Sequence, residues 1–554
     1  METLGKDYGS SNRGANEAPD ATSGAYTGEL GAAAGAGPSA LALLTDLYQL
    51  TMALGYWATG QAEREAVFHL TFRRPPFAGG YAIAAGIQPA LEYLTKLRFS
   101  DSDLAYLETL RDADGAQMFP RGFLDYLAAF RFSCSVDAVP EGTLVFAHEP
   151  LVRVRGPILA AQLVETPLLT MINFQTLIAT KASRVVAAAA GQPVLEFGLR
   201  RAQGIDGGLA ASRAAYLGGC AATSNVLAGK LYGIPVRGTH AHSWVMFHDD
   251  ELAAFRAYAD ALPGNCTFLV DTYDTLEGVR HAITVGRELA ARGRRLLGIR
   301  LDSGDLAYLS IEARRMLDEA GFPDTRIVAS NDLDETLIGS LREQGARIDT
   351  WGVGTKLVTA YDQPALGGVY KLGAIRDDDG AWRQAIKLSE QPIKISNPGQ
   401  LQVCRLRRGD QLVADVIYDE VSGLTRPLVL HDLEDPERVH ELAVAGLSEQ
   451  QLLEPMLDRG QVVPRDASLA SARARAAAQL AELSPRTRRF LNPQPHPVGL
   501  DAKVHAEKRR LVEAARRAAR SPESPERPGT AGGGPDAPGA PDAPAPASGQ
   551  GGAS

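Results

Sequence analysis

Short apolar runs alternate with amphipathic stretches through the middle of the chain. The runs typical of buried strands are 193–197, 267–271, 296–302, 326–330 and 349–354. Between them, apolar positions recur with helical spacing, as in segments 275–292 and 305–320. This alternation predicts βαβ units and a parallel sheet. Because several units follow one another without a dinucleotide-binding fingerprint, the pattern favours an α/β barrel over an open, doubly wound sheet.

Segments on both sides of this core alternate in the manner of exposed β-strands. The clearest are 142–155 and 401–418, and we expect them to meet in one smaller α+β domain built from both ends of the chain. The expected organisation is an N-terminal part at 39–150, a catalytic barrel at 151–380 and a C-terminal part at 381–500.

The two ends of the chain differ in composition from the middle. Residues 1–38 are rich in Gly, Ala and Ser, and residues 521–554 contain no Leu, Ile, Val or aromatic residue. Such segments cannot bury enough apolar surface to offset chain entropy, so we expect disordered tails. Before the second tail, residues 501–520 carry a Lys/Arg/Ala-rich pattern that predicts a solvated helix.

The overall composition is that of a soluble globular enzyme. Of the 554 residues, 45% are hydrophobic and 22% charged, and the net charge of -9 argues against a nucleic-acid partner. The four scattered cysteines predict buried free thiols. There is no apolar signal region and no run of about 20 apolar residues, so we expect a cytoplasmic protein without a membrane partner.

Polar and small residues cluster where the predicted strands end. In α/β barrels these carboxyl ends carry the active site. An aspartate after a strand can instead simply cap the next helix, but repetition at four strands favours a site. The residues concerned are Asp271, Arg300, Asp302, Ser330, Asn331, Asp332, Gly354 and Thr355.

The segment LEFGLRRAQG, residues 195–204, joins an aromatic residue to a pair of arginines. The guanidinium of Arg200 offers a fork that matches a carboxylate or phosphate, and Phe197 could stack on a flat ring. An aromatic ring bearing a carboxylate would suit both features. The alternative is a surface arginine pair beside a core phenylalanine.

The segment GTHAHSWVMF, residues 238–247, leaves three interpretations open. His240 and His242 point to opposite sides of an extended backbone, so they act as a pair only if the chain turns. They could form a metal site of the amidohydrolase type, or His242 followed by Ser243 could act alone. They could also be ordinary histidines near a helix start.

Two further segments suggest phosphate and cation chemistry. In residues 298–310, Arg300 and Asp302 face the same side of a strand, and carboxylates there can bind Mg²⁺ or ribose hydroxyls. Segments 328–335 and 351–359 each place small residues before a helix, where backbone N–H groups bind phosphate. The chain has no Walker A motif, so use of ATP would need another kind of site.

Together these motifs resemble the nicotinate phosphoribosyltransferases, over about residues 40 to 500. The resemblance implies an irregular α/β barrel of the type II phosphoribosyltransferase kind, a smaller domain from both chain ends, and dimers with active sites at the subunit interface. It also implies transfer of ribose 5-phosphate from phosphoribosyl pyrophosphate (PRPP) to nicotinate, with Mg²⁺ and with ATP hydrolysis through a phosphohistidine. The motifs are TDLYQLTMALGYW, FRRPPFAGGYAIAAG, ETPLLTMINFQTLIATKASR, LEFGLRRAQG, GTHAHSWV, IRLDSGDL, VASNDLDE, DTWGVGTKLVT and GGVYKL.

For the base and the phosphorylated residue, the resemblance points to four positions. His242 of the AHS motif matches the phosphorylated histidine, whereas His240 stands where an apolar residue is more usual. Tyr48 and Phe197 would lie on opposite faces of the pyridine ring, with Arg200 near its acid group.

For PRPP, the resemblance places Arg300 and Asp302 near the ribose and the base, as catalytic residues. Lys181 and Arg184 would lie near the pyrophosphate. Asp271, with Asp302, would hold the ribose or the magnesium network, through water or directly. The remaining phosphate-binding positions are Ser330, Asn331, Gly352, Gly354 and Thr355.

Three other functions are alternatives. A nicotinamide phosphoribosyltransferase shares the fold, but the LRRAQG and TSN segments follow the nicotinate pattern. The sequence also lacks a clear acidic residue near the ring site that could hold an amide. A zinc amidohydrolase built on His240 and His242 would need further histidines at later strand ends. A non-catalytic barrel would be expected to lose a motif residue, and none is missing.

Overall fold

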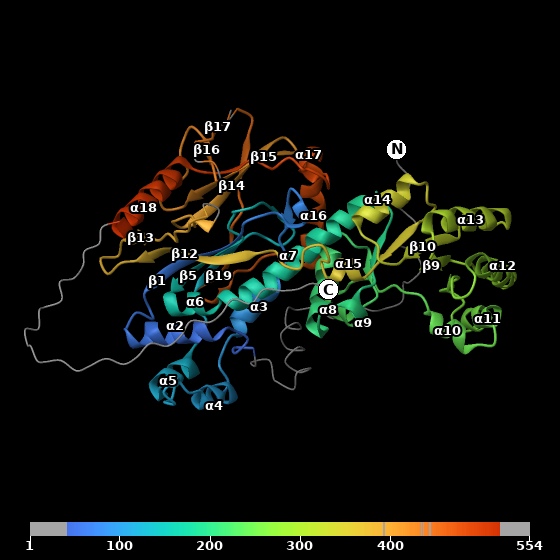
Figure 1. Ribbon diagram of the computed structural model, residues 1–554, viewed down its shortest axis with the longest axis horizontal. Coiled ribbons are helices and arrows are strands. Elements are labelled where there is room, and N and C mark those ends of the chain that lie inside the picture. The colour runs from blue at the N-terminus through green and yellow to red at the C-terminus, as the bar shows by residue number, and fades with distance from the viewer. Residues whose placement is uncertain (1–40, 392–393, 434, 436, 443–444, 521–554) are drawn as a thin grey trace, which may run out of the picture.

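The computed structural model describes residues 41–520 apart from 392–393, 434, 436 and 443–444 (Figure 1). The tails expected to be disordered lie outside the described residues. Within the described part, the strands form three larger sheets and one two-stranded ribbon, β2 (Ala82–Ile83) with β4 (Leu144–Val145). None of the described helices is long and apolar enough to cross a membrane.

The predicted parallel sheet is present, with strand order β7-β6-β11-β10-β9-β8. All five strands expected from the apolar runs are confirmed, which confirms the α/β fold. The last strand of the unit, β11, pairs with the first, β6, as in a barrel. The strands are β6 (Val194–Glu196), β7 (Ala222–Thr223), β8 (Thr267–Leu269), β9 (Gly298–Leu301), β10 (Arg326–Ser330) and β11 (Thr350–Val353).

The sheet is nevertheless open between β7 and β8, so the expected closed barrel is not confirmed. Beyond β7, pairing among the described residues continues through a single bridge between Thr223 and Val236. At the free edge of β8, the backbone N–H of Leu269 donates to Nε2 of His240 at 3.2 Å. A side chain therefore satisfies a donor that a neighbouring strand would satisfy in a closed barrel.

Helices accompany the parallel strands. Segments 275–292 and 305–320 are confirmed as α12 and α13, and their N-caps are Asp274 and Asp305, while Asp334 caps α14. The helices are α8 (Ile205–Leu217), α9 (Val226–Tyr232), α10 (His242–Phe247), α11 (Glu251–Ala261), α12 (Thr275–Ala291), α13 (Leu306–Glu319), α14 (Glu335–Glu343), α15 (Thr355–Val358) and the 3₁₀ turn η2 (Leu199–Arg201).

A seven-stranded sheet in the order β13-β12-β1-β5-β3-β19-β20 combines segments from before and after the parallel sheet. β5 and β12 fall inside the range 151–380 that was expected for the barrel, but both pair with β1 here. The strands are β1 (Glu65–Phe72), β3 (Ser135–Ala138), β5 (Val152–Pro157), β12 (Gly368–Arg376), β13 (Trp382–Gln384), β19 (Glu454–Asp458) and β20 (Gln461–Val462).

The third sheet, in the order β17-β16-β21-β15-β14-β18, is an additional β unit near the C-terminus. Segments 142–155 and 401–418, expected in one domain, therefore lie in different sheets. The helix expected at 501–520 is confirmed as α18 (Ala502–Arg520). The strands are β14 (Leu401–Arg408), β15 (Gln411–Asp419), β16 (Val429–Asp432), β17 (Val439–Glu441), β18 (Ser448–Gln451) and β21 (Val498–Leu500).

The long helix α7 (Glu165–Ala188) runs between the antiparallel and parallel sheets and packs on α8 and α14 (Figure 1). The buried side of α7 therefore contacts β12 of the antiparallel sheet as well as the helices α8 and α14 that accompany the parallel sheet. All four cysteines are free and buried, as expected. The other helices are α2 (Leu47–Ala58), η1 (Pro76–Ala78), α3 (Ile87–Lys96), α4 (Asp101–Thr109), α5 (Arg121–Ala129), α6 (Ile158–Leu163), α16 (Leu469–Glu482) and α17 (Pro485–Arg488).

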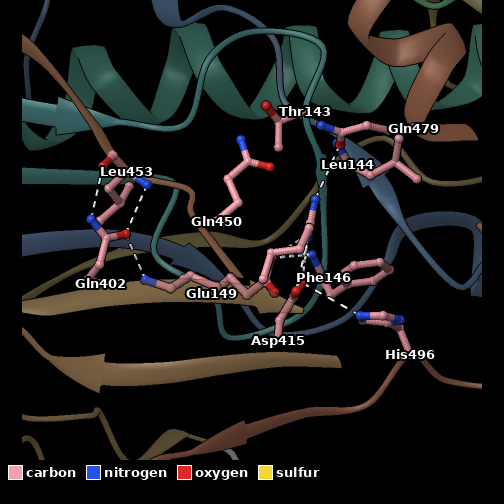
Figure 2. A network of polar contacts seen from close by, with 12 residues as sticks. Thr143, Leu144, Phe146, Glu149, Gln402, Asp415, Gln450, Leu453, Gln479 and His496 are labelled. Atoms are coloured by element: carbon pink, nitrogen blue, oxygen red, sulfur yellow. Dashed lines mark hydrogen bonds and ion pairs between the residues drawn. The ribbon is translucent and has the colours of Figure 1, made fainter. Parts of the chain in front are cut away.

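A buried polar network joins the third sheet to the β4–β5 connection (Figure 2). Arg405 of β14 donates to both carboxylate oxygens of Asp415 in β15, and Glu149 lies beside this pair. The ring of His496 stacks on Phe146 with centroids 4.0 Å apart. Burial and the neighbouring Asp415 carboxylate raise the pKa of Glu149 well above its ordinary value.

Candidate active site

The strand-end aspartates Asp271 and Asp302 do not cap the helices that follow them. Those caps are supplied three residues later in each case, by Asp274 and Asp305. The alternative interpretation of the strand-end carboxylates as ordinary caps is therefore wrong at these two positions, and their side chains are available for other contacts.

Arg300, Asp302 and Ser330 form one hydrogen-bonded cluster at the ends of β9 and β10. Arg300 Nη2 lies 2.7 Å from Asp302 Oδ1, and its Nε donates to Ser330 Oγ at 2.8 Å. Ser330 also donates to Asp302. Burial pushes the pKa of Asp302 upward, but the Ser330 hydroxyl and the Arg300 guanidinium outweigh it, so the net shift is downward. Asp302 is thus held ionised.

Asp271, two residues after β8, contacts the backbone of this cluster. Its Oδ2 accepts hydrogen bonds from the backbone N–H of Asp302 and from the Ser303 hydroxyl, both at 2.7 Å. Its Oδ1 is buried and has no hydrogen-bond partner among the described residues. An unpaired buried carboxylate oxygen is costly, and it suits a cation or a cation-bound water.

His242 begins α10 and lies against the same cluster. Its Nδ1 is 3.1 Å from Thr272 Oγ1, and its Nε2 is 3.7 Å from Asp302 Oδ2. Thr272 belongs to none of the motifs named above, so its contact with His242 was not predicted from the sequence.

His240 is a structural residue, separate from His242. It is 8% exposed, its ring lies among Phe255, Tyr258 and Phe268, and its Nε2 is already bonded to the β8 backbone. Burial lowers the pKa of His240 to about 4. With its Nε2 committed in this way, His240 does not form a metal-binding pair with His242. In the part of the chain that the structure describes, no group of three or more His, Cys, Asp or Glu is placed to hold a metal ion.

Phe197 is fixed between the strand ends. Its backbone N–H donates to Val353 O at 2.8 Å, and a Cβ at Gly352 would lie only 2.7 Å from its ring, so residue 352 must be glycine for this packing. The guanidinium carbon of Arg300 lies 5.8 Å from the centre of the Phe197 ring. Arg200, two residues beyond Gly198, is exposed on η2.

The expected phosphate turn lies next to this ring. Gly354 and Thr355 lead from β11 into the single turn of α15, and a Cβ at Gly354 would approach the backbone of Phe197 at 3.3 Å. After β10, Asn331 has φ 111°, a conformation that L side chains rarely adopt. Lys356 pairs with Asp334 at 2.6 Å.

Lys181 and Arg184 are neutralised by acidic partners rather than free. Both lie on the buried side of α7 and contact the same carboxylate: Lys181 Nζ lies 2.7 Å from Glu335 Oε2, and Arg184 Nε lies 2.7 Å from Glu335 Oε1. Asp362 also pairs with Lys181, at 2.5 Å. Glu335 was missed because, in sequence, it looks like an ordinary first-turn residue of a helix.

Tyr48 is not brought to this cluster within one chain. It is 47% exposed on α2, which lies at the opposite side of the molecule from β9 and β10 (Figure 1). Burial and the Glu165 carboxylate raise its pKa.

A small basic cavity of about 40 Å³ was also not predicted from the sequence. Arg73, Lys371 and Lys394 line it together with His148 and Ser396. Burial lowers the pKa of Lys371 overall. The Glu165 carboxylate, which raises the pKa of Tyr48, opposes this shift. The cavity lies at the antiparallel sheet, because Thr71 of β1 and Lys371 of β12 line it and these two strands pair.

The fold and this geometry define a class: an α/β enzyme in which an aromatic ring packs against the glycine turn after β11, with an arginine–aspartate–serine cluster at the ends of β9 and β10. Family models match along nearly the whole described chain. They are the nicotinate phosphoribosyltransferase N-terminal domain at 43–173, the nicotinate phosphoribosyltransferase family at 193–388 and the corresponding C-terminal domain at 400–508.

Individual relatives agree with these matches. A nicotinate phosphoribosyltransferase of Bacillus subtilis is 44% identical over 85% of this chain and 97% of its own length. One from Mycobacterium tuberculosis is 43% identical, covering 73% of this chain and 84% of its own. The crystal structure of human nicotinic acid phosphoribosyltransferase superposes with a TM-score of 0.73 at 33% identity, covering 84% of this chain and 99% of the human one. The chain belongs to the nicotinate phosphoribosyltransferase family.

Proposed function

We propose that this chain transfers ribose 5-phosphate from PRPP to the ring nitrogen of nicotinate, releasing pyrophosphate and forming nicotinate mononucleotide. The observation that carries the proposal is the position of Phe197, which packs on Gly352 and approaches Gly354. A flat base stacked on this ring would lie beside the turn that suits the 5-phosphate of PRPP.

The chemistry needs positioning and charge rather than a protein nucleophile, because the pyridine nitrogen itself attacks the ribose. Positive charge develops on the sugar in the transition state. The ionised Asp302, held by Arg300 and Ser330, supplies a fixed negative charge for it. Arg200, exposed near Phe197, is the proposed partner of the nicotinate carboxylate.

Lys181 and Arg184 are the proposed pyrophosphate ligands. Their present ion pairs with Glu335 and Asp362 mean that an anion must compete for them. Asp362 is the exchangeable partner, because half of its side chain is exposed whereas Glu335 is buried. We propose that the pyrophosphate displaces Asp362 and leaves Glu335 in place.

The carboxylates fit a magnesium ion. Asp271 Oδ1 has no partner in the described chain, and Asp302 stands beside it, so these two residues would hold Mg²⁺ directly or through water. When bound, the ion supplies charge neutralisation for the departing pyrophosphate.

ATP coupling is assigned to His242. Phosphorylation of its ring would add negative charge and oxygen acceptors next to Asp302, and so change the affinity for cation and pyrophosphate. Thr272 holds the other ring nitrogen.

A homodimer with shared active sites accounts for Tyr48. Because Tyr48 is exposed on α2, at the opposite side of its own chain from β9 and β10, we propose that Tyr48 of the partner subunit covers the base. Helix α2 would then face the strand ends of the partner. The division into a barrel-like parallel unit and a domain from both chain ends, and a cytoplasmic location, are parts of the same proposal.

The test is an assay of purified protein with PRPP, Mg²⁺ and ATP that follows nicotinate mononucleotide and ADP together. We expect product from nicotinate, ATP stimulation and no product from nicotinamide. Product from nicotinamide alone would favour the nicotinamide-specific alternative. No product from either base would overturn the proposal and leave only the family fold.

A further inference from the structure

Glu196 is a buried carboxylate directly behind the aromatic slot. It is the last residue of β6, only 1% exposed, and immediately precedes Phe197. Its Oε1 accepts a hydrogen bond from the backbone N–H of Gly198 at 2.5 Å. Its Oε2 accepts from the hydroxyls of Ser212 at 2.8 Å and Thr223 at 2.5 Å.

No cation pairs with Glu196 in the described part of the chain, which sets it apart from Glu141, Glu335 and Asp415, each of which faces an arginine. Burying a carboxylate without a counter-ion is expensive unless several donors stabilise it. The three donors on Glu196 do so, and each comes from a different element that borders the site.

Glu196 therefore links three segments. Gly198 lies in the turn that leads to Arg200, Ser212 lies on α8, and Thr223 ends β7. Thr223 in turn accepts from the backbone N–H of Asn225, which caps α9. The carboxylate is the common point of these contacts.

The opposite side of the Gly198 turn is closed by α15. A Cβ at Gly198 would lie 2.3 Å from Val358 Cγ1, so the turn has no free space on that side. The turn is thus clamped between the Glu196 carboxylate and the helix that follows the phosphate turn. If the hydrogen bond to Gly198 were lost, the backbone on the Glu196 side would be free to move.

We propose that Glu196 is a positioning residue for base binding: it fixes the Phe197–Arg200 turn so that the ring and the guanidinium meet the aromatic acid together. This inference rests on the proposed function. It assigns Glu196 to the geometry of the base slot and leaves PRPP binding to other residues, because the Gly354 turn is held by β11.

The hydrogen-bond pattern allows a neutral rescue. In Glu196→Gln, the amide oxygen can still accept from Gly198. The amide NH₂ can donate to Ser212, whose single hydroxyl proton can then turn from residue 196 to Gly208 O, 3.0 Å away. The Glu196→Ala variant removes all three contacts and leaves the Gly198 N–H unsatisfied.

The experiment compares Glu196→Ala, Glu196→Gln and a matched control, Thr325→Val. Thr325 is also buried and hydrogen-bonded, to Leu296 O, but lies before β10 at the opposite end of the same sheet. The measurements are kcat, the KM values for nicotinate and PRPP, the thermal midpoint, and amide hydrogen exchange in residues 197–204.

We expect Glu196→Ala to raise the KM for nicotinate about tenfold or more, to change kcat and the KM for PRPP less than about threefold, and to speed exchange in 197–204. Glu196→Gln should stay close to wild type, and Thr325→Val should lower only the thermal midpoint. If Glu196→Ala does not fold, the milder Ser212→Ala and Thr223→Val should show the same pattern more weakly.

Equal rises in both KM values, or a Gln variant as poor as the Ala variant, would overturn the positioning role. If the wild-type protein does not turn over nicotinate, the proposed function fails, and hydrogen exchange still decides whether Glu196 holds the turn. Unchanged exchange in Glu196→Ala would overturn the inference by itself.

Discussion

The imidazole of His242 bridges two strand ends: its Nε2 lies 3.7 Å from Asp302 Oδ2 and its Nδ1 lies 3.1 Å from Thr272 Oγ1. A phosphoryl group on Nε2 would stand directly beside the ionised Asp302. Two negative groups at this distance repel each other unless a cation lies between them. The contact therefore couples the charge state of His242 to that of the Arg300–Asp302–Ser330 cluster.

Replacing His242 with alanine should separate ATP hydrolysis from transfer. We expect His242→Ala to lose ADP formation by about 100-fold or more, because the phosphoryl acceptor is gone, while slower transfer without ATP stimulation persists. The ratio of ADP to nicotinate mononucleotide in a single reaction measures this. His248→Gln, directly after the same helix, is the control and should keep the ratio. Full ATP stimulation in His242→Ala would contradict the assignment.

Removing the charge of Asp302 should slow transfer without unfolding the protein. In Asp302→Asn, the side-chain oxygen can still accept from Arg300 and Ser330, so the thermal midpoint should change little. We expect kcat to fall about 10²- to 10³-fold, because the fixed charge opposite the cationic sugar is lost. Asp305→Asn, in the same turn, should be neutral because asparagine caps a helix as well as aspartate does. A kcat near wild type in Asp302→Asn would remove this residue from the mechanism.

Glu335 and Asp362 should differ sharply when each is removed. Glu335→Ala leaves Lys181 and Arg184 buried with reduced compensation, and breaking such a pair typically costs about 3–5 kcal/mol. Asp362 is half-exposed, so Asp362→Ala should cost at most about 1 kcal/mol. Urea unfolding of both variants measures the difference. Similar costs for the two would show that the ion pairs do not form as described.

Local features of the sheet could be predicted from the sequence because each depends on residues that are close together in the chain. The strand at 326–330 is a continuous apolar run between turn signals, and the structure places β10 at the same residues. The sequence connects Gly352 with the close approach of a phosphate, and the structure places the Phe197 ring where a Cβ of residue 352 would lie.

Long-range features could not be predicted in this way. The barrel closure depends on whether the edges of β7 and β8 meet, and a histidine side chain at position 240 occupies the β8 edge instead. From the sequence alone, Lys181 and Arg184 would be expected to be free cations. The carboxylate that neutralises them, Glu335, lies more than 150 residues away from Arg184 in the chain. Nor does the sequence show which of two nearby aspartates, Asp271 or Asp274, caps α12.

Acid should destabilise the protein through its buried histidines. Burial lowers the pKa of His69 to about 3, with Arg153 adding to the shift, and burial lowers the pKa of His240 to about 4. A pKa depressed in the folded state contributes stability above the unfolded value of about 6.5, and that stability is lost as the pH falls towards the folded value.

Between pH 7 and pH 5, each of these two histidines should therefore remove about 2 kcal/mol from the free energy of unfolding. Urea unfolding at both pH values measures the loss. His69→Gln keeps an acceptor for the Leu401 N–H and should lose correspondingly less stability on acidification. Substituting the exposed His440 with glutamine should leave the pH dependence as in wild type. An unchanged pH dependence in His69→Gln would mean that His69 is not the group that must take up a proton when the protein unfolds in acid.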